Sequence, residues 1–134
     1  MSNTIEKIEC FTWNGEQFSV TFNVNLAKKL TGILTELGHK PNVQITIEQA
    51  KEALGFNTEQ RDPEAVNAAN IANPIIAVQM YNTRTTRLEM LIIDGWHRLE
   101  KFASLNEGTL PCWVLPHEGL EALVIEGELP KEQT

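Results

Sequence analysis

The chain has 134 residues, of which 42% are hydrophobic and 22% are charged, and this composition is typical of one globular domain with a buried core. No apolar run approaches the ~20 residues that a membrane helix needs. Residues 1–4 lack the basic and apolar regions of a signal peptide, so we expect a cytoplasmic protein without a membrane partner. The formal net charge of −7 disfavours a nucleic-acid partner, whose phosphates would have to be neutralised by Lys and Arg.

We expect one domain over 1–134, with an N-terminal hairpin and helix over 1–42, a core over 43–125 and an acidic tail over 126–134. Apolar residues alternate with polar ones on either side of Asn14-Gly15, a dipeptide that supplies the positive φ angles of a type I′ turn. This pattern predicts a β-hairpin. Its alternating residues are Phe11, Trp13, Phe18, Val20 and Phe22.

The first predicted helix follows this hairpin. Asn25 can cap its start and Gly38 can end it. Its apolar residues have helical spacing, which predicts one stripe that packs on the core. The stripe consists of Leu26, Leu30, Ile33, Leu34 and Leu37.

Two shorter helices are predicted before residue 74. A short strand at 43–45 precedes Thr46 and Gln49, which have capping-box spacing for a helix through Leu54, closed by Gly55. The dipeptide Asp62-Pro63 is typical of a helix start, and that helix should end before residue 74, which is a proline.

Strands and helices alternate more regularly in the second half. An apolar strand over 75–80 leads through a polar loop over 82–87 to an interior strand over 88–93. A helix over 96–106, a strand over 111–115 and a short helix over 119–125 follow. Strand, turn, helix and strand make a crossover unit whose apolar strands suit a sheet covered by helices. We therefore predict an α/β fold of the α+β kind.

The side chains best suited to chemistry lie at the turn Asp94-Gly95-Trp96-His97-Arg98, where a strand ends and a helix begins. Free N–H groups at a helix start favour an anion, and Gly95 lets the backbone approach a ligand closely. Arg98 offers a fork of donors to phosphate oxygens, and His97 offers a donor near neutral pH. Asp94 is expected to hold Mg²⁺, to orient His97 or to accept a proton.

A structural interpretation of the same turn stays open. Asp94 can serve only as a helix cap, Trp96 can pack on the core, and Arg98 can belong to a solvated face with Glu100.

Residues 73–115 resemble the core of the ParB/sulfiredoxin superfamily. The pattern of that family is a Pro-led strand, a loop, a strand ending in a Gly-containing turn, a helix with a basic residue near its start, and a short Pro-led strand. In this chain these features are Asn73-Pro74-Ile75-Ile76-Ala77-Val78, the strand over 88–93, Asp94-Gly95-Trp96-His97-Arg98 and Leu110-Pro111-Cys112-Trp113-Val114.

The Asp-Gly-x-His-Arg form is similar to the motif of free-serine kinases and ParB-like nuclease domains. The resemblance implies a small mixed sheet flanked by helices. It also implies that Gly95, His97 and Arg98 bind nucleotide phosphates at the helix start. We count Trp96 among the nucleotide-binding residues and expect ATP or CTP with Mg²⁺, for which Asp94 is the candidate ligand.

Three departures narrow what the resemblance implies. Sulfiredoxin carries its reactive Cys where this chain has Trp96, so sulfiredoxin chemistry is not expected. Partition proteins carry a Glu and paired Arg residues in this turn and a DNA-binding helical domain beyond it. The kinases use an upstream acid, for which Glu48 is the candidate here, although an acid in the first turn of a helix also has a structural role.

The cysteines and remaining histidines suggest no zinc site. Cys10 and Cys112 lie far apart near large apolar residues, so we expect buried, reduced thiols. His39 and His117 have no ligand spacing to a partner.

Three functions are therefore carried forward. The leading hypothesis is a nucleotide-binding domain that hydrolyses or transfers a phosphate. The second is a non-enzymatic regulatory or interaction module, in which the acidic tail and an exposed Trp96 face a protein partner. The third is a metal-dependent nuclease.

Overall fold

The computed structural model of the protein describes residues 9–15 and 19–130. The strands are β1 (Cys10–Asn14), β2 (Ser19–Asn23), β3 (Val43–Ile45), β4 (Ile75–Asn82), β5 (Arg87–Asp94), β6 (Leu110–Leu115) and β7 (Val124–Gly127). The helices are α1 (Val24–Glu36), α2 (Ile47–Phe56), α3 (Pro63–Ala68) and α4 (Trp96–Leu105), and η1 (Leu120–Leu123) is a 3₁₀ helix. Among these described residues, no helix has both the length and the apolar character needed to cross a membrane.

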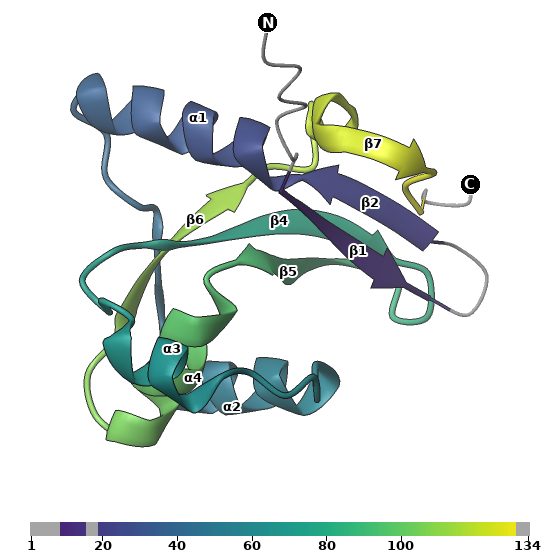
Figure 1. The fold of residues 1–134 in the computed structure, drawn as a ribbon. Coiled ribbons are helices and arrows are strands. Elements are labelled where there is room, and N and C mark those ends of the chain that lie inside the picture. Colours follow the sequence, from purple (N-terminus) through teal and green to yellow (C-terminus); the bar gives the residue numbers. More distant parts are fainter. Residues whose placement is uncertain (1–8, 16–18, 131–134) are drawn as a thin grey trace, which may run out of the picture.

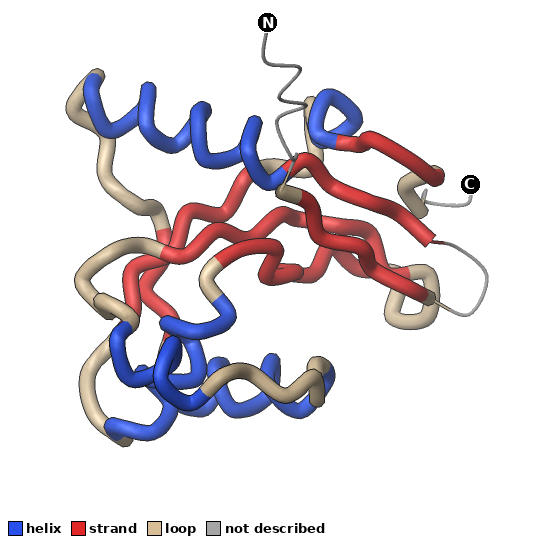
Figure 2. Tube along the Cα trace, in the orientation of Figure 1, coloured by secondary structure: helices blue, strands red, loops and turns tan. Residues whose placement is uncertain are grey.

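The strands form two sheets, which are shown in Figures 1 and 2. The larger has the order β3-β6-β4-β5, with β4 parallel to β6 and antiparallel to β5. The smaller is antiparallel throughout, with the order β1-β2-β7. The α+β fold class with a small mixed sheet is therefore confirmed.

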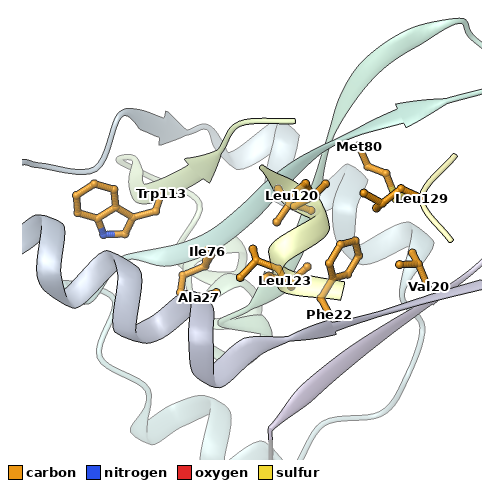
Figure 3. Packing of buried hydrophobic residues seen from close by; sticks show 11 residues of the cluster. Val20, Phe22, Ala27, Ile76, Met80, Trp113, Leu120, Leu123 and Leu129 are labelled. Carbon is orange, nitrogen blue, oxygen red and sulfur yellow. The ribbon is translucent and has the colours of Figure 1, made fainter. Parts of the chain in front are cut away.

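Strand β4 separates two hydrophobic cores, because successive side chains of a strand point to opposite faces of its sheet. Ile76 and Val78 face a cluster between the two sheets, which also receives side chains from α1 and η1. Ile75 and Ala77 face the cluster beneath α2 and α4. Figure 3 shows part of the first cluster, including Val20, Phe22, Ala27, Ile76, Met80, Trp113, Leu120, Leu123 and Leu129.

The predicted hairpin is present, but its turn differs from the prediction. Asn14 pairs with Ser19, so residues 15–18 connect the strands instead of a two-residue turn at Asn14-Gly15. Neither Asn14 nor Gly15 has a positive φ, which a type I′ turn requires at both central residues. Phe18, one of the predicted alternating residues, lies outside the described residues.

Helix α1 begins earlier than predicted and buries a different face. Its N-cap is Asn23, whose side chain accepts from the Leu26 N–H. Strand β2 ends at this residue, so the strand passes directly into the helix. The buried residues of the helix are Val24, Ala27 and Thr31. Of the predicted stripe, Leu26 and Leu34 are partly buried and pack on the core, whereas the other three residues are exposed. The exposed fractions of Leu30, Ile33 and Leu37 are 39%, 54% and 70%.

The capping signals of the two following helices are confirmed. Thr46 and Gln49 form both hydrogen bonds of the capping box, and the Asp62 side chain accepts from the Glu64 N–H. Helix α2 continues through Gly55 to Phe56, so Gly55 does not close it.

Two predictions about the second half were wrong. Strand β5 is an edge strand and not interior, since within residues 9–15 and 19–130 only β4 pairs with it. Ile92 and Ile93 are nevertheless buried as expected, at 3% and 2% exposure. The predicted helix over 119–125 is a 3₁₀ helix followed by strand β7, which pairs with β2. Local periodicity does not reveal this strand, because its partner lies about a hundred residues earlier in the chain.

Candidate functional site

The Asp94–Arg98 turn joins the end of β5 to the start of α4, as the sequence predicted. Gly95 is the N-cap residue, with a φ of 98°, and no side-chain hydrogen bond caps the helix. A Cβ at Gly95 would lie 2.4 Å from Ile75 Cγ2, so both the backbone conformation and the packing require glycine. The first N–H groups of α4 are therefore left without a side-chain acceptor.

Arg98 fastens this turn to the sheet. Its Nη1 donates to the Pro74 carbonyl at 2.7 Å, and its Nη2 donates to Asp94 Oδ2 at 3.0 Å. The side chains of Arg98 and Asp94 are only 20% and 12% exposed, so this pair is shielded from solvent. Arg98 is thus not part of a solvated face, and its guanidinium holds the acid in place.

A chain of alternating charges continues from Asp94. Its other oxygen, Oδ1, lies 3.8 Å from Lys28 Nζ on α1. Lys28 Nζ also donates to both carboxylate oxygens of Glu9, at 2.8 and 3.1 Å. Asp94 therefore lies between two cations that come from different helices.

A cleft of about 350 Å³ opens beside this turn. It lies between β1, the turn and the loop that leads from α2 to α3. Its lining residues are Glu9, Cys10, Phe11, Val24, Asn57, Glu59, Gln60, Arg61, Asp62, Ile93, Asp94, Gly95, Trp96 and His97.

Two aromatic rings and one arginine gather at the cleft. The Phe11 and Trp96 rings are stacked, with centroids 6.0 Å apart and planes inclined by 20°. The Arg61 guanidinium carbon lies 5.9 Å from the Trp96 ring centroid, a cation–π geometry. Arg61 Nε also donates to Glu100 at 3.2 Å. Trp96 Nε1 is buried and has no hydrogen-bond partner among the described residues.

The structure brings together four of the six candidate residues. Asp94, Gly95, Trp96 and His97 line the cleft, and His97 is exposed there. Arg98 and Glu48 do not line it. Arg98 is turned toward Pro74, and Glu48 is exposed in the first turn of α2.

Two further relationships differ from the sequence expectations. Within the described residues no hydrogen bond joins Asp94 to His97, because the Asp94 carboxylate is paired with Arg98 instead. Trp96 is half-buried and stacked, so it is not the exposed side chain that the interaction hypothesis invoked.

Sequence reasoning missed Arg61, Phe11 and Glu9. Arg61 precedes Asp62-Pro63, a dipeptide whose pattern indicates a helix start and nothing about its neighbour. Phe11 and Glu9 belong to the hairpin segment, far from the turn in the chain. No local pattern could place these three side chains beside α4, because tertiary packing alone brings them there.

The two thiols have different environments. Cys112 is buried as expected, and desolvation raises the pKa of its thiol to about 12, so the thiol stays protonated. Cys10 is exposed and lines the cleft, which corrects the expectation that both thiols are buried.

Within residues 9–15 and 19–130, no three His, Cys, Asp or Glu side chains gather in a way that could hold a metal ion. Comparisons of the chain with protein-family models, with curated protein sequences and with solved structures find no match. The resemblance of residues 73–115 to the ParB/sulfiredoxin superfamily therefore stays an interpretation of the sequence.

Proposed function

We propose that the protein binds a nucleotide in the cleft, with its phosphates at the start of α4. The observation that carries this proposal is that the cleft opens on an uncapped helix N-terminus with Gly95 at the N-cap. Unpaired N–H groups and the positive end of the helix dipole favour phosphate at such a place. The same residues carry the sequence resemblance to nucleotide-binding domains.

The cationic groups that face the phosphates differ from those that the sequence indicated. Arg61 and His97 line the cleft, and Arg61 donates to Glu100 and the Asn57 carbonyl without using Nη1 among the described residues. Arg98 does not line the cleft, and both of its Nη atoms donate, to Pro74 and Asp94. We assign direct phosphate contact to Arg61, His97 and the amides of the turn. Arg98 becomes a positioning residue that acts through Asp94.

Phe11 and Trp96 are suited to the base of the nucleotide. Their stacked rings lie in the wall of the cleft next to the helix start. Aromatic faces stack on nucleotide bases with little dependence on base identity. This arrangement supports nucleotides as a class.

The carboxylates of the cleft fit a Mg²⁺ ion brought by the nucleotide. Mg²⁺ is commonly held by one or two carboxylates together with phosphate oxygens. Asp94 and Glu9 both line the cleft and both contact Lys28, so two acids already surround one cation there. Bound there, the ion would neutralise phosphate charge. Asp94, held by Arg98, is the residue we propose as proton acceptor if the phosphate is transferred or hydrolysed.

A non-catalytic interaction module is the second candidate, and the charge of the cleft favours it. Four carboxylates line the cleft, from Glu9, Glu59, Asp62 and Asp94, against the cation of Arg61 and the titratable ring of His97. Without a metal ion this lining favours a cationic group, such as a Lys or Arg side chain of a partner. No specific observation favours the metal-dependent nuclease.

A thermal-shift panel of ATP, ADP, CTP and GTP, each with and without Mg²⁺, separates the two candidates. A ligand at ~100 times its dissociation constant adds about 2.7 kcal/mol of stability, which is several degrees for a domain of this size. We expect stabilisation that depends on Mg²⁺. Flat responses at millimolar nucleotide would reject nucleotide binding and favour the interaction module.

Asp94→Asn then distinguishes binding from chemistry. The amide keeps the shape of the side chain and can still accept from Arg98. We expect this variant to retain nucleotide binding, because Glu9, Arg61 and the turn amides still face Mg²⁺ and the phosphates, and to lose any phosphate release. Equal phosphate release from the native protein and from the Asp94→Asn variant would show that Asp94 takes no part in the proposed chemistry.

A further inference from the structure

Helix α1 carries an apolar stripe that no described element covers. Leu30, Ile33 and Leu37 are 39%, 54% and 70% exposed. The helix packs on the core through the adjacent face, from which Val24, Ala27 and Thr31 are buried. Figure 1 shows α1 along an outer edge of the molecule. The exposed stripe is therefore additional to the face that the fold itself uses.

The spacing of the stripe is that of paired helices. Half-buried Leu26 precedes the three exposed residues, and the successive intervals are four, three and four residues. Apolar residues repeated in this way form the seam along which two helices pack. A stripe required only for packing within the domain would not continue along a solvent-exposed face.

Two opposite charges lie beside the stripe, and a two-fold axis would bring each of them next to the other one in a second copy. Lys29 and Glu36 are exposed on its solvent side, and neither makes an ion pair with a described residue. They are seven residues apart, about 10 Å along the helix axis, which is too far for a bond within one helix. An antiparallel copy of α1 would bring Lys29 beside Glu36 of the second copy, and the reverse.

We propose that the protein forms a symmetric homodimer through antiparallel packing of α1 against α1 of a second copy. Leu30 of each chain lies against Ile33 of the other, and Leu26 lies against Leu37. The same alignment pairs Lys29 with Glu36 on each side of the axis. A parallel arrangement would leave these two charges at different levels, so the ion pairs specify the antiparallel one.

Sedimentation equilibrium of the full chain, over protein concentrations up to about 1 mM, tests the dimer. We expect a monomer–dimer equilibrium. Ile33→Glu places two like charges in the seam and should weaken dimerisation at least a hundredfold. Leu88→Glu is the matched control, because Leu88 on β5 is similarly exposed, at 48%, but lies outside α1. It should leave the dimer unchanged.

Charge exchange tests the antiparallel arrangement. Lys29→Glu and Glu36→Lys should each weaken the dimer about tenfold, because each creates two like-charged contacts, and the double variant should restore it. A native chain that stays monomeric, or a dimer that Ile33→Glu leaves intact, would overturn the proposal. Single charge variants that dimerise like the native chain would overturn the antiparallel pairing. Circular dichroism of each variant verifies that α1 is retained.

Discussion

The two walls of the cleft are held in different ways. The turn wall, residues 93–97, is fixed to the sheet by the shielded bonds of Arg98 and by Gly95 packed on Ile75. The loop wall, residues 57–62, is mostly exposed, and its main tie is the contact of Arg61 with Glu100 and Trp96. The Arg61 side chain is only 10% exposed, but Glu100 is 37% exposed, so solvent reaches one partner of this ion pair and weakens it.

This difference suggests that the turn wall contributes mainly to the stability of the fold and the loop wall mainly to ligand binding. Atoms that a ligand must meet in fixed geometry are best held on rigid elements, and the turn wall has that character. The loop wall can adjust to a ligand at little cost to the fold. We therefore expect substitutions in the turn wall to lower stability, and substitutions in the loop wall to lower affinity with little effect on stability.

Gly95→Ala should have the largest effect on stability. Alanine at a positive φ costs about 1–2 kcal/mol, and overpacking against Ile75 adds about 1–3 kcal/mol. We expect a loss of about 2–5 kcal/mol in the free energy of unfolding, measured by urea denaturation. Gly108→Ala is the control, since Gly108 also has a positive φ, 82°, but its Cβ would meet no atom within 4 Å. Equal losses in the two variants would mean that packing on Ile75 contributes nothing.

Arg98→Ala should lower stability by a similar or slightly smaller amount. The substitution removes two hydrogen bonds, one of them to a carboxylate that is only 12% exposed. A hydrogen bond to a charged group contributes about 1.5–3 kcal/mol, so we expect a loss of about 2–3 kcal/mol. Arg98→Lys should not restore it fully, because an ammonium cannot reproduce the planar fork. A loss below about 0.5 kcal/mol, the range of ordinary surface sites, would contradict the anchoring role.

Arg61→Ala should lower stability by about 1–2 kcal/mol, less than the turn-wall variants, because the Arg61 side chain is 10% exposed but its partner Glu100 is reached by solvent. The same substitution should weaken nucleotide affinity ten- to a hundredfold in calorimetric titrations, through the loss of a charge-assisted phosphate contact. Glu100→Gln is the control, since it removes the negative charge beside Arg61 at a residue that does not line the cleft. Unchanged affinity in Arg61→Ala would remove this residue from the binding site.

The thiol reagent DTNB should modify Cys10 and leave Cys112 intact in the folded protein. Cys10 is exposed at the cleft, whereas Cys112 is buried with a pKa of about 12. We expect one reactive thiol, lost in Cys10→Ser, and slower modification when Mg²⁺-nucleotide is bound. If saturating nucleotide does not slow the modification of Cys10, the ligand does not occupy the cleft beside β1.

The elements that local chemistry determines were predictable from the sequence. The capping box of Thr46 and Gln49, the helix start at Asp62, and the turn from β5 into α4 all depend on residues a few positions apart. The contacts that close the cleft depend on distant parts of the chain. Arg98 donates to the Pro74 carbonyl, 24 residues earlier in the sequence. Phe11 stacks on Trp96, although the two residues lie far apart in the sequence.

The buried face of α1 shows the same limit. Its leucines predicted a core-facing stripe, yet smaller residues such as Ala27 face the core. Close approach of the helix to the core favours small side chains there, and periodicity alone does not distinguish two adjacent faces of one helix. Likewise, the guanidinium of Arg98 suits phosphate, but only the structure shows that it is already bonded to Asp94.

Nuclear magnetic resonance of the ¹⁵N-labelled protein, titrated with Mg²⁺-ATP and then Mg²⁺-CTP, tests nucleotide binding at the start of α4 most directly. We expect saturable shifts in the amides of Gly95, Trp96 and His97, together with the indole N–H of Trp96. Signals from the exposed β5 residues Leu88 and Met90 should stay in place. Unchanged turn signals at saturating nucleotide, or shifts confined to residues outside the cleft, would contradict the proposed site.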